Sequence, residues 1–146
     1  MKVLLSAGLS LLLLTGACKK SSRDGSLYGN WKLKWYSAGL AGGFQPGPDS
    51  VYILSLQGDH QFTSKINADV KGIGAYTVTD IKVGDDHTPA IAFGNLPGPG
   101  GPCNCGSLPP GVISAGMTLS YQLNKDTLIL GTSIADGPAF QYERVN

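Results

Sequence analysis

Short segments that alternate apolar and polar residues recur along the chain, and turn-forming residues separate them. In the segment NWKLKWY, the side chains of Trp31, Leu33 and Trp35 are predicted to share one buried face, with Tyr36 and the lysines on the opposite face. The twenty-one glycines and nine prolines fit many turns between short strands. We expect further strands at residues 51–57, 61–66, 73–83, 90–93, 117–123, 127–131 and 139–145.

This pattern predicts an all-β protein. Short connections favour antiparallel pairing between successive strands. An up-and-down barrel of about eight strands is the simplest arrangement, because closure removes the exposed edges of a sheet. A barrel of this size is filled by its own side chains or leaves room for one small ligand.

The N-terminal residues are typical of a signal peptide. Lys2 precedes an uncharged, mostly apolar run over residues 3–17, which is too short to span a bilayer comfortably. The sequence LTGAC resembles a bacterial lipobox, which implies that Cys18 carries lipid. The alternative is an ordinary signal peptide followed by an incidental cysteine. We therefore divide the chain into a lipoprotein signal peptide (1–17), a lipidated cysteine with a polar tether (18–26) and a barrel domain (27–146).

Lipidation would make a membrane the first partner of this protein. Two acyl chains anchor a chain without a membrane-spanning segment. The expected location is the bacterial outer membrane, and the periplasmic face is favoured because residues 19–22, KKSS, lack the acidic residues that mark surface export in Bacteroidota. Without Lys2, ten basic residues balance ten acidic ones, so no nucleic-acid partner is predicted.

The other two cysteines lie in a segment rich in glycine and proline, residues 97–111. Once Cys18 is assigned to lipid, Cys103 and Cys105 form an even pair in an oxidising compartment, and we predict a disulfide. A ring this small is strained, so the bond is either a structural staple or a labile redox pair. The alternative is a Cu(I) site with His60 or His87 as further ligands. No metal or cofactor is included in the prediction.

Several motifs together resemble a known family. Gly29-Asn30-Trp31 opens the first strand and Arg144 lies in the last, and the segments GAYTV, YQLNKDTLIL and FQYERV lie between or around them. In this order they resemble the small lipocalin-like lipoproteins of Bacteroidota. The resemblance implies a lipocalin-like barrel in which Gly29, Trp31 and Arg144 close one end. A META-type domain is the nearest competing resemblance.

The candidate ligand-binding residues are apolar or aromatic side chains expected inside the barrel or at its mouth. Two of them lie in the long connection 37–50, which has the length of a lid or binding loop. The alternative at each position is that the side chain simply belongs to the core. The candidates are Trp35, Leu40, Phe44, Tyr76, Tyr121 and Tyr142.

No group of residues in the sequence predicts catalysis. Asp85, Asp86 and His87 lie in a glycine-bounded turn and are expected to be solvated surface. The chain lacks a nucleophile elbow, a zinc-protease motif and a phosphate loop. We therefore expect a non-catalytic envelope protein that binds a small apolar or amphipathic ligand. The alternative is an interaction or inhibitor module with a filled barrel, which binds an envelope protein through the loops 37–50 and 94–111.

Overall fold

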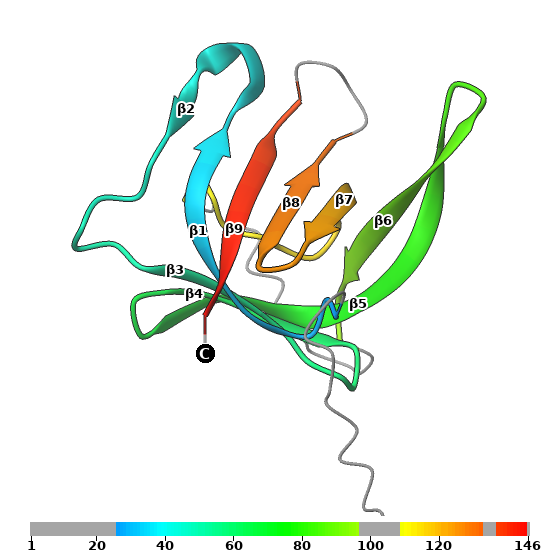
Figure 1. Ribbon diagram of the computed structural model, residues 1–146. Helices are drawn as coiled ribbons and strands as arrows, with labels where there is room; N and C mark the ends of the chain where they lie inside the picture. The colour runs from blue at the N-terminus through cyan, green and yellow to red at the C-terminus, as the bar shows by residue number, and fades with distance from the viewer. Residues whose placement is uncertain (1–25, 97–108, 133–136, 146) are drawn as a thin grey trace, which may run out of the picture.

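A computed structural model shows the chain as a closed antiparallel β-barrel (Figure 1). It describes residues 26–96, 109–132 and 137–145. Eight strands follow one another around the ring, and pairing of the first with the last closes it, which confirms the predicted all-β up-and-down barrel. These strands are β1 (Gly29–Ser37), β3 (Tyr52–Leu56), β4 (Gln61–Ile66), β5 (Asp69–Val83), β6 (Asp86–Gly94), β7 (Thr118–Asn124), β8 (Thr127–Gly131) and β9 (Ala139–Val145).

The interior is filled by apolar side chains that alternate along the strands. On β8, for example, Leu128 and Leu130 are fully buried while Ile129 between them faces solvent. None of the cluster's side chains is more than 3% exposed, and burial of each contributes about 1.5–3 kcal/mol. The cluster consists of Trp31, Leu33, Leu54, Leu56, Phe62, Tyr76, Ile91, Phe93, Ile113, Leu119, Leu128, Leu130, Phe140 and Tyr142.

The first strand departs from the predicted alternation. Its register with β9 shifts between Leu33 and Trp35, so that one extra residue, Lys34, is accommodated in a β-bulge. Beyond the bulge Tyr36 packs against the core and Trp35 lies on the outer surface. The prediction that Trp31, Leu33 and Trp35 share one face was therefore wrong, because the bulge reverses the phase of the strand.

The hairpin formed by β5 and β6 is longer than predicted. Both strands extend beyond the barrel, and the hairpin projects as a twisted ribbon (Figure 1). The turn lies at Gly84 and Asp85, whereas Asp86 and His87 belong to β6, so the prediction that Asp86 and His87 lie in the turn was wrong. The projecting ribbon is largely exposed, so no apolar–polar alternation in the sequence marks this part of β6.

The connection 37–50 contains structure of its own. A 3₁₀ turn, η1 (Gly39–Ala41), leads into the short strand β2 (Gly43–Phe44), which pairs with the end of β1. Phe44 packs against Tyr36, with ring centroids 5.3 Å apart. β2 thus extends the sheet beyond the point where β3 stops pairing with β1 at Lys32. In the described part of the chain, no helix is long and apolar enough to cross a membrane.

Two glycines allow β5 to curve around the barrel. β5 runs across the lower part of the molecule and then bends upward (Figure 1). A Cβ on Gly72 would lie 2.7 Å from the carbonyl oxygen of Ile113, and one on Gly74 would collide with the carbonyl oxygen of Gly94 and lie 2.6 Å from the Phe62 ring. The backbone approaches its neighbours closely here because no side chain intervenes.

Replacing Gly74 with alanine is therefore expected to destabilise the barrel. The added methyl group would displace backbone and a core ring, which costs about 1–3 kcal/mol. Urea unfolding should show this loss for Gly74→Ala. Gly58→Ala is the control, because a Cβ there meets no atom within 4 Å, and its free energy of unfolding should change by less than about 0.5 kcal/mol. Equal stability of the two variants would contradict the close packing of β5.

Candidate functional site

One end of the barrel is closed by Arg144 and Trp31, which are direct partners in the ladder between β9 and β1. The guanidinium lies over the buried indole, with its Cζ atom 4.1 Å from the ring centroid. Nη1 donates a hydrogen bond to the carbonyl oxygen of Tyr28 at 2.7 Å, and Nη2 donates to that of Ser26. Nε lies 3.5 Å from Oδ1 of Asp126, as an ion pair without hydrogen-bond geometry.

Gly29 makes room for this arrangement. A Cβ at position 29 would lie 2.7 Å from Nη1 of Arg144, and the residue has a φ of +141°, which L side chains rarely adopt. The indole of Trp31 also donates a hydrogen bond to the carbonyl oxygen of Leu27 at 2.9 Å. The structure thus brings Gly29, Trp31 and Arg144 into one cluster, in which the indole is covered and offers no face to a ligand.

The tyrosines considered as interior ligand contacts are part of the packed core or lie against it. Tyr76 and Tyr142 are each 2% exposed, and Tyr121 is partly buried against the cluster. The Tyr76 hydroxyl donates a hydrogen bond to the carbonyl oxygen of Gln57 at 2.8 Å. Beside Ser64 and Tyr142 lies a hollow of about 10 Å³, which has room for no more than a single water. The described side chains of the core cluster are therefore packed closely against one another, each at most 3% exposed.

Burial also raises the pKa of two of these phenols. Burial, with smaller contributions from the nearby Tyr28 and Asp59, raises the pKa of Tyr76 to about 12. Burial raises the pKa of Tyr142 well above its ordinary value of 10.0. Both hydroxyls remain protonated at physiological pH, so they act as packed neutral groups.

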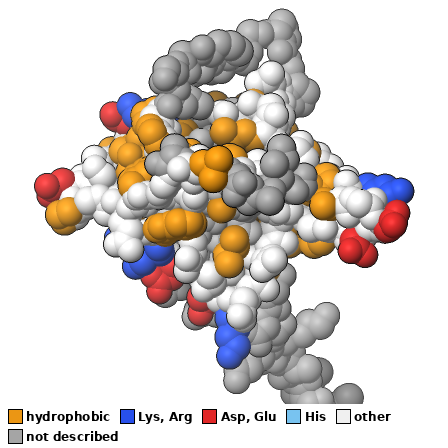
Figure 2. Space-filling model, turned by 90° about the horizontal axis from the view of Figure 1, so that it is seen from above, with side chains coloured by type: hydrophobic (Ala, Val, Ile, Leu, Met, Phe, Trp, Pro, Cys, Tyr) orange, Lys and Arg blue, Asp and Glu red, His pale blue; other side chains and the backbone are white. Residues whose placement is uncertain are grey.

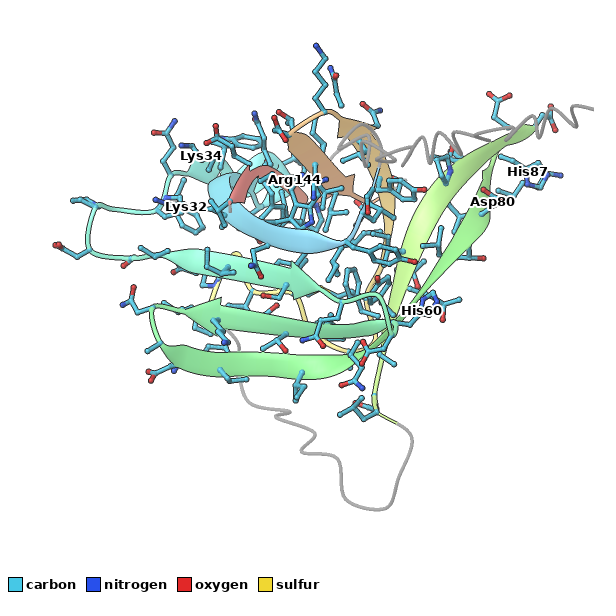
Figure 3. All side chains as sticks on the ribbon, turned by 60° about the horizontal axis from the view of Figure 1, so that its bottom comes forward. Lys32, Lys34, His60, Asp80, His87 and Arg144 are labelled. Atoms are coloured by element: carbon cyan, nitrogen blue, oxygen red, sulfur yellow. The ribbon has the colours of Figure 1, made fainter. Side chains whose placement is uncertain are left out.

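The polar residues that could hold a metal lie in different parts of the molecule. His60 lies in the turn between β3 and β4, whereas Asp80 and His87 lie on the projecting hairpin, far from Lys32 and Lys34 (Figure 3). Within the described ranges, no three His, Cys, Asp or Glu side chains are close enough together to hold a metal ion. Cys18, Cys103 and Cys105 lie outside the described residues, so the predicted lipidation and disulfide stay predictions.

The two apolar residues of the 37–50 connection have different surroundings. Phe44 packs between Tyr36 and Tyr52, whereas Leu40 on η1 is 89% exposed. Figure 2 looks onto the end of the barrel that carries η1; hydrophobic side chains are spread across its middle and charged side chains lie at its projecting edges. Phe44 thus anchors the connection to the barrel, and Leu40 lies free of the interior.

The outer surface beside Trp35 is hollowed. Lys34, Trp35, Gln45 and Gln141 line an open hollow of about 420 Å³. Trp35 and Gln141 face each other across the ladder between β1 and β9, and the bulge places Lys34 and Trp35 together on the outside. The Trp35 side chain is 37% exposed. Part of the indole is therefore open to solvent in a shallow surface hollow, which it shares with one lysine and two glutamines.

A second hollow continues the first along β1. It measures about 240 Å³ and shares Lys34 and Gln45 with the first hollow. Its other lining residues are Lys32 and Leu33 of β1 and Pro46, Gly47, Pro48, Ser50 and Val51 of the loop. On this side of β1, β3 pairs with residues up to Lys32 and β2 pairs with residues from Tyr36 onward. The second hollow lies beside the unpaired stretch between them. We call the two hollows together the outer groove.

Sequence reasoning placed Trp35 in the interior and missed this groove. The only signal was that Trp35 and Tyr36 are adjacent large aromatic residues, so alternation alone did not decide which of them faces the core. Gln45 and Gln141 belong to segments that are distant in sequence, and nothing in their local patterns connects them.

Comparisons with protein-family models, with curated proteins and with solved structures found no match to this chain. Inference about its function therefore starts from the geometry of the chain itself.

Arg144→Ala is expected to destabilise the barrel by about 2–3 kcal/mol, because it removes the contact with Trp31 and two hydrogen bonds from a charged donor. A fall of several degrees in melting temperature, measured by circular dichroism, checks this. Lys71→Ala is the control, since Lys71 forms an exposed ion pair with Asp69 and should contribute little. A melting temperature unchanged in Arg144→Ala would contradict the closure.

Alkaline pH is expected to destabilise the fold through its buried tyrosines. Tyr76 loses its proton near pH 10 when unfolded and near pH 12 when folded, so stability is constant below about pH 10 and decreases as the pH rises from 10 to 12. The shift corresponds to about 2–3 kcal/mol. Urea unfolding at several pH values should show a shallower decrease in Tyr76→Phe than in the wild type. An identical pH dependence in both proteins would refute this assignment.

Proposed function

We propose that this protein is a non-catalytic binding module of the bacterial cell envelope, and that it binds its partner on the outside of the barrel. Lipid on Cys18 and the polar tether would hold the domain at the membrane. The outer groove along β1 would then provide the recognition surface.

The packing of the interior supports an external site. The core side chains are at most 3% exposed, and a barrel of eight strands is just wide enough to be filled in this way. Of the two functions expected from the sequence, this packing favours the module with a filled barrel over the carrier of a small apolar ligand. The sequence predicted that such a module binds through its loops. The groove instead indicates that β1 and the loop beside it form the contact surface.

The observation that carries the proposal is the position of Trp35. A tryptophan that would bury a large apolar area in the core is instead held on the surface, in the wall of a hollow. Tryptophan is among the residues most enriched at the energetic centres of binding sites. An exposed tryptophan in a concave surface is therefore the best-supported binding residue in the described chain.

We expect the protein to bind isolated cell envelopes through Trp35. The full chain carrying Cys18→Ser, which lacks the thiol expected to carry lipid, would be mixed with envelopes of the host bacterium and sedimented. Trp35→Ala in this background should weaken saturable binding at least tenfold, because the aromatic surface is lost. Ile73→Ala is the control, since Ile73 is similarly exposed at 40% but lies on β5.

Equal binding by the Trp35→Ala and Ile73→Ala variants would overturn the proposal. So would a stoichiometric apolar molecule that co-purifies with the native protein and is detected by native mass spectrometry, since it would require space inside the barrel. Circular dichroism of both variants checks that each is folded.

A further inference from the structure

We infer that the outer groove is a binding site for a neutral carbohydrate chain. This inference rests on the proposed function and names the class of its ligand. It is drawn from three properties of the first hollow: an aromatic surface held by its neighbours, two primary amides beside it, and a single lysine whose charge is paired.

The aromatic surface is fixed by the backbone of β2. A Cβ on Gly43 would lie 2.9 Å from Cζ2 and 3.0 Å from Cε2 of Trp35, so the indole rests directly on the glycine. Such a Cβ would also lie 2.8 Å from the carbonyl oxygen of Tyr36, so a larger residue at position 43 would displace the ring or the neighbouring backbone of β1. The indole is thereby held in one orientation before a ligand arrives, which lowers the entropy lost on binding.

A fixed indole face suits a sugar ring. The face of an aromatic ring carries partial negative charge, and it attracts groups with partial positive charge at their edge. A pyranose presents C–H groups on one side of its ring and hydroxyl groups around its rim. Stacked on Trp35, the C–H side would cover the indole while the hydroxyl groups would point toward the surrounding walls of the groove.

Those walls carry amides. Gln45 and Gln141 line the same hollow as Trp35, and no side-chain hydrogen bond joins either amide to another described residue. A primary amide provides two donors and an acceptor, and a hydroxyl group is both donor and acceptor, so each glutamine can pair with sugar hydroxyls. The two amides come from β9 and from the loop after β2, so they reach the ring from different elements.

The charge of the first hollow, beside Trp35, favours a neutral ligand; Lys32 lines only the second hollow. The Nζ atom of Lys34 lies 3.0 Å from Oε2 of Glu143, so its charge is paired. The other three residues of the first hollow are uncharged. A phosphate or an acidic polymer would find no unpaired cation in this hollow, whereas a neutral sugar needs none.

The length of the groove favours a chain over a single sugar. The second hollow shares Lys34 and Gln45 with the first, and Pro46 and Pro48 hold the loop that forms its wall. Both hollows are open to solvent along β1. A polysaccharide could therefore lie along the groove and continue beyond it at either end.

The test uses the envelope-binding assay with treated envelopes. One sample is oxidised with periodate, which cleaves the vicinal diols of sugars, and is then quenched; the other is digested with a broad-specificity protease. We expect binding by the full chain carrying Cys18→Ser to fall at least tenfold after periodate and to survive the protease. Raising the salt concentration from 0.05 to 0.5 M should change the affinity less than twofold, because the charge beside Trp35, on Lys34, is already paired with Glu143.

Variants of the amides provide the matched comparison. Gln141→Ala and Gln45→Ala should each weaken binding to untreated envelopes at least fivefold, and Gly43→Val should do so by displacing the indole. Gln122→Ala is the control, because Gln122 is an exposed glutamine on β7 outside the groove. Circular dichroism confirms that the variants are folded.

The outcomes separate this inference from the proposed function. Binding that depends on Trp35 but survives periodate and is lost after protease would overturn the carbohydrate inference, and it would leave an external site for a protein partner. Binding that is lost after periodate yet unaffected by Gln45→Ala and Gln141→Ala would also overturn the assignment of these amides. Binding that does not depend on Trp35 would overturn both the inference and the proposed function.

Discussion

Closure of the barrel between β1 and β9 is the interaction on which the remaining structure depends. The ladder runs from Asn30 opposite Val145 to Ser37 opposite Ala139, and it pairs the two edges that an open sheet would expose. Arg144 covers one end of this ladder. Its guanidinium lies over Trp31 and donates a hydrogen bond to the carbonyl oxygen of Tyr28, just before β1. The closure therefore ties the start of the domain to its last strand, and Gly29 leaves the space that the guanidinium needs.

The bulge at Lys34 gives β1 two different roles. Before the bulge the strand contributes Trp31 and Leu33 to the core, and after it the strand presents Trp35 to solvent and buries Tyr36. One additional residue is enough, because side chains on a strand alternate with a period of two and a shift of one position exchanges the faces. The pairing of β1 with β3 ends at Lys32, just before the bulge, and the outer groove lies beside the residues that follow.

A filled interior moves the question of function to the surface. Eight strands enclose little space, and the large side chains of this core occupy it. The hollow beside Trp35 combines an aromatic ring, two amides and a lysine that is paired with Glu143, which is the chemistry of a site for a neutral, polar and partly apolar ligand. A partner of that kind fits a domain that is expected to be tethered at the surface of a membrane, where long polymers are within reach.

The sequence alone determined the strands, their order and the closed barrel, because alternation and turn residues are local signals that each strand carries. The contact of Trp31 with Arg144 also followed from the sequence, through the resemblance of its motifs to a known family. The outward position of Trp35, the strand β2 and the extension of β6 to Asp86 were decided only by the tertiary structure. A bulge depends on the register between β1 and β9, and the groove needs Gln45, Gln141 and Trp35 from three separate segments. The bulge and the groove both arise from pairing between strands that are distant in sequence, and no local pattern of residues predicts that pairing.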